Sequence, residues 1–297
     1  MKKLTFFLLF LAVCNFSFSY SHGTLIEDPL FPRYDESGEL PRNFRIVHYA
    51  NVGKSSSSFR GIKLLRASGS GQFSKQNFKK MLNQLSIDLD QLIVIDLRQE
   101  SHGFINGKAV SWTDGVNNYG NLFKSRREIE KDEVQRLMLA KKSKTIIINP
   151  LKRPVKEKVK EITTEREVVE GYGIRYIRLP VIDHNRPDND AVDQFIELVK
   201  NLPSDKWLHF HCKAGKGRTT IFLALYDIIK NCQTTSLEDI LKRQHFIGGC
   251  DFFKIKATEV ERKRAGISRI QFIHKFYTYC QQVPDFHISW TEWIEQQ

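Results

Sequence analysis

The residues best placed to do chemistry lie in one short stretch, His211-Cys-Lys-Ala-Gly-Lys-Gly-Arg-Thr219. A cysteine attacks as its thiolate, and neighbouring cations or a helix N-terminus lower the pKa of such a thiol. Arg218, six positions after Cys212, carries a planar guanidinium that can hold two oxygens of one phosphate, which a lysine ammonium cannot do. Thr219 adds a hydroxyl that can reach back to the sulfur. The stretch therefore predicts transfer of a phosphoryl group to a cysteine.

Two elements must hold this stretch in place. Residues 207–210 form a short apolar run that predicts a strand, and residues 221–230 are apolar nearly all round, which predicts a buried helix. Glycines in the intervening loop allow a tight turn with positive φ. A strand, a glycine-bearing loop and a helix start create a nest of backbone N–H groups directed at an anion. The expected phosphate cradle is Lys213, Ala214, Gly215, Lys216 and Gly217.

Two other interpretations of the stretch are weaker. A cysteine and an arginine at this spacing also occur by chance, and buried cysteines are usually inert packing residues. The chance interpretation is disfavoured because His211, both glycines, Thr219 and the flanking elements all agree. A nucleotide-binding Walker loop needs Ser or Thr after its Gly-Lys pair, whereas Lys216 is followed by Gly217.

A second chemical feature is the loop at residues 180–187, Pro-Val-Ile-Asp-His-Asn-Arg-Pro. An alkoxide is a poor leaving group, so a cysteine phosphatase needs a general acid on a nearby loop. Asp183 is the candidate, one loop, helix and strand before Cys212. An aspartate in a proline-flanked loop is otherwise a turn former, but its pairing with the cysteine loop favours the acid role.

Polar residues also crowd the stretch 96–103, Asp-Leu-Arg-Gln-Glu-Ser-His-Gly, directly after a buried strand expected at 92–96. The carboxyl ends of such strands are where sites form in α/β folds. The alternative is a solvated loop with local ion pairs. The basic run at 152–160 is either a solvated face or the lining of a polyanion site.

The remaining pattern predicts further strands and helices along the chain. Further strands are expected at 43–48, 61–66, 145–148 and 175–179, and helices at 74–85, 124–142, 190–201, 235–245 and 267–281. Another helix should begin near Thr164, which has Glu167 at capping-box spacing. The tail with Trp290 and Trp293 is expected to pack on the surface.

Length and charge limit the classes of function. A chain of 297 residues fits one large domain, or one domain with a substantial insertion. The net charge of +12 favours an acidic partner: nucleic acid, an anionic membrane or a polyphosphorylated substrate. Beyond the N-terminus no apolar run is long enough to span a membrane. Neither C-x-x-C nor a His/Cys cluster at zinc spacing occurs, so no metal or other cofactor is expected.

The N-terminus has the pattern of a secretory signal. Lys2 and Lys3 precede an apolar segment at 4–13, and small residues at 17, 19 and 21 fit a cleavage site. We expect a signal peptide at 1–21, a phosphatase domain at 22–297, and a periplasmic or secreted protein. A lipoprotein site at Cys14 fits less well, because Val13 is bulkier than the small residue expected there. A buried N-terminal helix is the other alternative.

The mature chain would keep Cys212, Cys232, Cys250 and Cys280. In an oxidising compartment these cysteines can pair. A nucleophilic cysteine must stay reduced or reducible, so at most one structural disulfide is compatible with activity, and the sequence does not choose the pair.

With these pieces assembled, the chain resembles the bacterial protein-tyrosine-phosphatase-like phytases, or cysteine phytases. The resemblance runs from about Asn43 to Trp293 and rests on residues 43–45, 96–103, 182–184, the cysteine loop and 243–249. Thr220 fits the phytases, since the tyrosine and lipid phosphatases usually have glycine there. The resemblance implies an α/β phosphatase core, a central sheet flanked by helices, with a small partial β-barrel added. It also implies an exported, metal-independent enzyme that removes phosphates stepwise from myo-inositol hexakisphosphate.

The resemblance implies roles for individual residues. Cys212 would be the nucleophile, Arg218 the phosphate clamp and Asp183 the general acid, with His184 beside it. Further substrate contacts would fall near Arg45, Asp96, Lys152 and Arg153.

The lysines at 213 and 216 depart from many phytases and match phosphoinositide lipid phosphatases. They leave open a phosphotyrosine or phosphoinositide phosphatase as an alternative, and a catalytically silent polyphosphate-binding module is a further rival. An inositol polyphosphate is the expected partner, with no nucleic acid and no stable membrane association, and the oligomeric state stays open.

Overall fold

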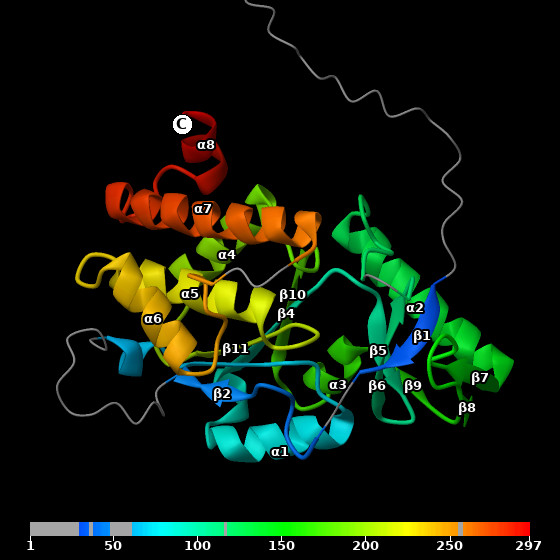
Figure 1. The fold of residues 1–297 in the computed structure, drawn as a ribbon. Helices are drawn as coiled ribbons and strands as arrows, with labels where there is room; N and C mark the ends of the chain where they lie inside the picture. Colours follow the sequence, from blue (N-terminus) through cyan, green and yellow to red (C-terminus); the bar gives the residue numbers. More distant parts are fainter. Residues whose placement is uncertain (1–29, 36–37, 48–60, 116–117, 255–257) are drawn as a thin grey trace, which may run out of the picture.

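The computed structural model describes residues 30–35, 38–47, 61–115, 118–254 and 258–297 (Figure 1). The expected signal peptide, including Cys14, lies outside these residues. A five-stranded sheet in the order β10-β4-β11-β3-β2 carries the cysteine loop. Its members are β2 (Arg45–Ile46), β3 (Ala67–Ser70), β4 (Leu92–Arg98), β10 (Arg175–Val181) and β11 (Trp207–His211). All neighbours are parallel except β2, which runs antiparallel to β3 at the edge.

The two central strands, β4 and β11, are buried along their whole length, as near-continuous apolar runs predict for a sheet covered on both faces. Successive side chains point to opposite faces of a strand. Ile93, Ile95 and Leu97 accordingly join one core cluster, whereas Leu92 and Val94 join another.

Helices cover both faces, as Figure 1 shows with α5, α6, α7 and α8 above the sheet and α1 below it. The first layer consists of α4 (Asn189–Lys200), α5 (Gly217–Asn231), α6 (Leu237–Phe246), α7 (Val260–Gln282) and α8 (Trp290–Glu295). The second layer consists of α1 (Lys75–Leu85) and α3 (Glu165–Glu170). Ser74 and Thr164 cap these two helices with reciprocal capping boxes, so both expected helix starts are confirmed.

The segment between β4 and β10 supplies most of a smaller β-rich part beside the main sheet. One antiparallel sheet has the order β1-β6-β5-β9, with β1 (Phe31–Tyr34), β5 (His102–Ile105), β6 (Lys108–Thr113) and β9 (Ile162–Thr163). A two-stranded sheet pairs β7 (Thr145–Ile148) with β8 (Val155–Lys158). Helix α2 (Arg126–Ser143) packs on both through a third core that contains Leu137 and Trp112. The expected α/β core with a β-rich addition is confirmed.

The strand expected at 61–66 is wrong. The structure has a short 3-10 helix there, η3 (Ile62–Leu64), and the strand β3 starts only at Ala67. The reason is packing against α5, because a Cβ at Gly69 would lie 2.7 Å from the Thr219 methyl carbon. Small residues are therefore required in β3 where α5 packs on it. Because glycine and serine are also typical of turns, the sequence of β3 does not indicate a strand. A second short 3-10 helix, η4 (Leu89–Gln91), leads into β4.

The expectation that the C-terminal tail packs on the surface is also wrong. Trp290 and Trp293 are 1% and 6% exposed. The Trp290 ring lies 5.5 Å from Phe272 and 5.8 Å from Phe276, both on α7. Its indole N–H donates to Asn189 Oδ1 at 3.1 Å, so α8 closes the core between α4 and α7.

Replacing Trp290 with alanine should therefore destabilise the protein, by about 3–5 kcal/mol as for other large-to-small core changes. Phe123→Ala is the matched control, since this aromatic side chain is 87% exposed, and it should change stability little. The measurement is urea unfolding of both variants. A Trp290→Ala protein as stable as the control would show that α8 contributes nothing to the core.

Candidate functional site

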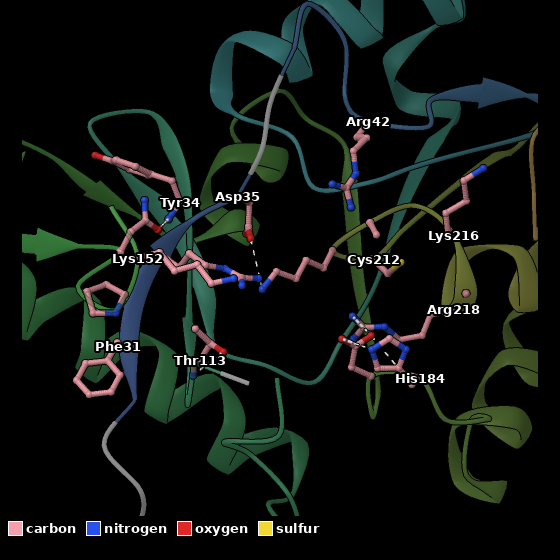
Figure 2. Close-up of a pocket in the computed structure, with 18 of the residues that line it drawn as sticks. Phe31, Tyr34, Asp35, Arg42, Thr113, Lys152, His184, Cys212, Lys216 and Arg218 are labelled. Atoms are coloured by element: carbon pink, nitrogen blue, oxygen red, sulfur yellow. Dashed lines mark hydrogen bonds and ion pairs between the residues drawn. The ribbon is translucent and has the colours of Figure 1, made fainter. Parts of the chain in front are cut away.

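A cavity of about 910 Å³ opens above the cysteine loop. Figure 2 shows Cys212, Arg218 and His184 on one side of it and Phe31, Tyr34 and Lys152 on the other. The first group lies in the cysteine loop, the start of α5 and the acid loop, and the second in β1 and the β7–β8 turn. The cavity is thus built where the two β-rich parts of the chain meet.

The backbone carbonyls of the cysteine loop accept hydrogen bonds from residues that support the loop. The Lys213 carbonyl accepts from the backbone N–H of Gln72 at 3.1 Å, and the Ala214 carbonyl from the Asn43 side chain at 2.7 Å. The Gly215 carbonyl accepts from Arg45 Nη1 at 2.7 Å. In a planar trans peptide the N–H points opposite to the C=O. The N–H groups that follow these carbonyls therefore point away from the supporting residues, as an anion cradle requires.

Gly215 has φ of +71°, and a Cβ there would collide with the backbone of Ser70 and Gly71. Glycine is therefore required at this position by both conformation and space. Gly215 does not line the cavity but packs against Ser70 at the end of β3 and against the following Gly71. Arg45 acts from the same side, since its Nη2 also donates to Thr220 Oγ1 at 3.2 Å. The structure thus places Arg45 behind the loop and not at the cavity.

Thr219 Oγ1 donates to the sulfur of Cys212 at 3.2 Å, so the hydroxyl reaches the sulfur as its spacing suggests. Thr219 is fully buried, and Cys212 is 2% exposed at the floor of the cavity. The same hydroxyl lies 3.3 Å from the Ser70 carbonyl oxygen, so Thr219 connects the sulfur to the end of β3.

Arg218 is fixed by a buried carboxylate that was not singled out in the sequence. Its Nη1 and Nη2 donate to Glu100 at 2.7 and 3.0 Å, and Nη1 also donates to the Val181 carbonyl at 3.1 Å. Burial by itself would raise the pKa of Glu100, but Arg218 and then Arg98 hold that pKa well below its usual value. Arg218 Nε has no acceptor among the described residues. This N–H is a donor available to a phosphate oxygen.

Asp183 lies beside this guanidinium. Its Oδ1 is 3.1 Å from Arg218 Nη2, and its Oδ2 accepts from Asn118 Nδ2 at 2.6 Å. Burial alone would raise the pKa of Asp183, but the charge of Arg218 outweighs burial and the pKa is lowered. His184 Nε2 is 3.6 Å from Asp183 Oδ2, and burial lowers the pKa of this imidazole. The resting acid is therefore an ionised carboxylate.

The two loop lysines point in different directions. Lys213 Nζ donates to Asn118 Oδ1 at 2.7 Å and lies 3.7 Å from Asp35 Oδ1. Burial lowers its pKa to about 8. Lys216 Nζ instead donates to the Gly248 carbonyl at 2.7 Å, and Figure 2 shows its side chain directed away from Cys212. Lys213 is thus the loop cation nearer the centre of the cavity.

The structure brings most of the predicted site residues to one cavity. Those that line it are Cys212, Lys213, Ala214, Lys216, Gly217, Arg218, Asp183, His184, Lys152 and Arg153. Three further cations line it that the sequence did not single out, namely Arg33, Arg42 and Arg269. They come from separate segments with no local motif, so nothing in the sequence marked them.

Asp96 does not line the cavity. It is fully buried beneath the loop, where it accepts a hydrogen bond from Tyr176 at 2.8 Å and lies 3.2 Å from Arg178 Nε. His102 Nε2 is 3.3 Å from Asp96 and 3.4 Å from Glu165. The stretch 96–103 therefore contributes to the site through Glu100, and Asp96 belongs to a supporting ion-pair network.

Asp96, His102 and Glu165 are close enough to be considered as a metal site. Burial and Arg98 lower the pKa of His102, but Asp96 and Glu133 outweigh them and raise it to about 10. A protonated imidazole and the Arg178 guanidinium already supply cations to these carboxylates. The three residues therefore fit an ion-pair network better than a ligand set.

No helix in the described ranges is long and apolar enough to cross a membrane.

Comparison with known proteins agrees with this geometry. A family model described as PTP-like phytase, with inositol hexakisphosphate in its description, matches residues 95–230. The chain is 34% identical to a PTP-like myo-inositol phosphatase from Mitsuokella multacida, solved with myo-inositol-(1,3,4,5)-tetrakisphosphate, at a TM-score of 0.82. This match covers 90% of the chain but 48% of the Mitsuokella chain.

An effector protein, hopD2 of Pseudomonas syringae pv. tomato, is 28% identical over 68% of the chain and 46% of its own length. The chain therefore spans about half of these two relatives. A PTP-like phytase from Bdellovibrio bacteriovorus is 32% identical over 90% of the chain and 95% of its own length, with a TM-score of 0.73. This likeness over nearly the whole of both chains shows that the protein belongs to the family of PTP-like phytases.

Proposed function

We propose that the protein is a cysteine-dependent phosphatase that hydrolyses myo-inositol hexakisphosphate and lower inositol polyphosphates stepwise. The observation that supports this most is the distribution of cations around one cavity. Cys212 and Arg218 form a cradle for one phosphate, while Arg33, Lys152 and Arg153 line the opposite wall. A substrate with several phosphates on one ring would present one to the cradle and others to that wall. A volume of about 910 Å³ is within the range of small-molecule sites.

In the first step the Cys212 thiolate attacks phosphorus, and the bond from phosphorus to the inositol oxygen breaks. Backbone N–H groups and Arg218 hold the non-bridging oxygens, which is the usual source of stabilisation in phosphoryl transfer. Asp183 gives its proton to the departing inositol oxygen. In the second step Asp183 accepts a proton from water, and that water attacks the cysteinyl phosphate to release inorganic phosphate and the thiolate.

The ion pair between Asp183 and Arg218 links substrate binding to protonation of the general acid. The incoming phosphate competes for Arg218 Nη2, which in the free protein lies 3.1 Å from Asp183 Oδ1. A carboxylate that loses its cation and gains a neighbouring dianion has a raised pKa. Binding of the phosphate therefore favours the protonated form of Asp183 that the first step needs.

A phosphoinositide or phosphotyrosine phosphatase is the second candidate. Lys213 favours it, because this lysine lies in the cavity and matches the loop of lipid phosphatases. A silent polyphosphate-binding module is disfavoured, since Cys212, Arg218 and Asp183 come together in the cavity.

We also propose that residues 1–21 are a cleaved signal peptide and that the protein is periplasmic or secreted. The basic residues, apolar segment and small residues of this leader support export. N-terminal sequencing of protein from the periplasm or medium tests it. A chain that keeps its leader and remains in the cytoplasm would contradict export without affecting the proposed reaction.

Cys212→Ser should abolish turnover of inositol hexakisphosphate and preserve binding, because a hydroxyl is far less ionised than a thiol at neutral pH. Phosphate release and titration calorimetry with the same substrate measure the two properties. Substantial turnover by the serine variant would refute cysteine catalysis.

Asp183→Asn should slow phosphoenzyme formation from inositol hexakisphosphate by about 100-fold or more, the usual scale for loss of a general acid. An aryl phosphate has a better leaving group and needs less protonation, so its turnover should fall less. Rapid-quench measurements on both substrates give the comparison. Equal losses would assign the acid role to another group.

Charge reversal at Lys152 and Arg153 together should weaken capture of inositol hexakisphosphate more than capture of an aryl monophosphate. Both residues line the wall opposite Cys212, and their attraction grows with ligand charge and is screened by salt. Lys156→Glu with Lys158→Glu is the control, with the same change of net charge on the same hairpin but outside the cavity lining. KM across a salt series is measured, and equal salt sensitivity for the two substrates would reject polyanion capture.

A further inference from the structure

Asn118 connects the acid loop to the cysteine loop. It lies between β6 and α2, 65 positions before Asp183 and 95 positions before Lys213. Its Nδ2 donates to Asp183 Oδ2 at 2.6 Å, and its Oδ1 accepts from Lys213 Nζ at 2.7 Å. An ammonium can only donate and an ionised carboxylate can only accept. The two partners therefore fix which end of the amide faces which loop.

The two oxygens of Asp183 have different surroundings. Oδ1 is 3.1 Å from Arg218 Nη2 and accepts from the His184 backbone N–H at 3.1 Å. Oδ2 accepts from Asn118. A bound phosphate competes for Arg218 but not for Asn118, which is held by Lys213. Oδ1 therefore loses its contact with Arg218 to the phosphate and keeps only the His184 backbone N–H, whereas Oδ2 keeps the Asn118 donor.

We propose that Asn118 is a positioning residue that keeps Asp183 Oδ2 as a hydrogen-bond acceptor, so that the catalytic proton resides on Oδ1, beside Arg218. Oδ1 is the oxygen next to the guanidinium that holds the phosphate, and so the oxygen nearer the leaving group. The same side chain ties the orientation of the acid to Lys213 of the cysteine loop. This inference rests on the proposed reaction, in which Asp183 is the general acid.

Loss of the Asn118 N–H donor should change the pH dependence of catalysis. An N–H that donates to a carboxylate stabilises its charged form and lowers its pKa. Removal of that N–H therefore raises the pKa of Asp183, and activity that needs protonated Asp183 persists to higher pH. In a plot of kcat against pH, the fall in activity at high pH (the basic limb) reports the pKa of the general acid in the enzyme–substrate complex. That limb should move upward in pH when the Asn118 donor is lost.

Other charged groups also face Asp183. Arg218 and Glu100 act from α5 and the end of β4, and His184 from its own loop. Tyr119 and Arg269 are close enough to interact with it electrostatically. Substitution of Asn118 leaves all of them in place, so a shift of the limb is attributable to Asn118 and its partner Lys213.

The experiment compares kcat–pH profiles of the wild type, Asn118→Ala and Asn118→Asp on inositol hexakisphosphate and on an aryl phosphate. Alanine removes the donor, and aspartate keeps the shape of asparagine but places a like charge against Asp183, which raises its pKa further. We expect the basic limb to rise in the order wild type, alanine, aspartate, with a step of about one pH unit for alanine. At the optimum, kcat on inositol hexakisphosphate should fall about tenfold, and on the aryl phosphate at most about twofold.

Asn83→Ala, at an exposed position on α1, controls for loss of an asparagine and should leave both profiles unchanged. An unmoved limb in both Asn118 variants, or equal losses on the two substrates, would overturn the inference. Asp183→Asn separates it from the proposed function, because that variant should lose the basic limb altogether. If the Asp183→Asn variant keeps the basic limb of its kcat–pH profile, Asp183 is not the general acid. If that variant loses the basic limb but neither Asn118 variant shifts it, Asp183 remains the acid and only the role of Asn118 is rejected. Lys213→Met should retain the limb, and its loss in that variant would assign the titration to Lys213 instead.

Discussion

The site depends on one buried ion pair, the bidentate contact between Arg218 and Glu100. Glu100 is in turn held by Arg98 Nε at 2.9 Å, and Arg98 Nη1 donates to Asp35 at 3.0 Å and to Gln72 at 2.5 Å. Apart from Arg98 and Glu100, which share one segment, the partners come from different parts of the chain, so the orientation of the phosphate clamp is set by the assembled fold. Removal of one member of a buried pair leaves an uncompensated charge and typically costs about 3–5 kcal/mol.

This ion pair is part of a larger buried network that joins the two β-rich parts of the protein. The carboxylates are Asp35, Asp96, Glu100, Glu133 and Glu165, and the cations are Arg98, Arg178, Arg218, Lys213 and protonated His102. A buried network is favourable only when its members are paired. The nearby carboxylates raise the pKa of His102, and its protonated ring then supplies positive charge that the buried acids would otherwise lack. The network supports the cysteine loop from below, while the cavity opens above it.

The sequence predicted those parts of the site that are encoded locally. The cysteine loop and its flanking strand and helix form one continuous segment, and the acid loop shows a proline-flanked aspartate at a suitable interval. Glu100 and Asn118 escaped prediction as individual residues because their partners are 118 and 65 positions away. Strand β3 and the buried Trp290 were missed for the same reason. The small residues of β3 are required by contact with α5, and Trp290 is buried by helices that a single sequence does not place.

In the free protein the Asp183 carboxylate already occupies part of the anion-binding face of Arg218. A ligand that enters the cradle must displace a carboxylate already 3.1 Å from the guanidinium. Small ions of single charge gain little from that exchange, because they replace one negative charge with another. A phosphate dianion gains more, and further phosphates on the same molecule add the attraction of the opposite wall. The Asp183 carboxylate in the free site therefore favours ligands of higher negative charge over singly charged anions.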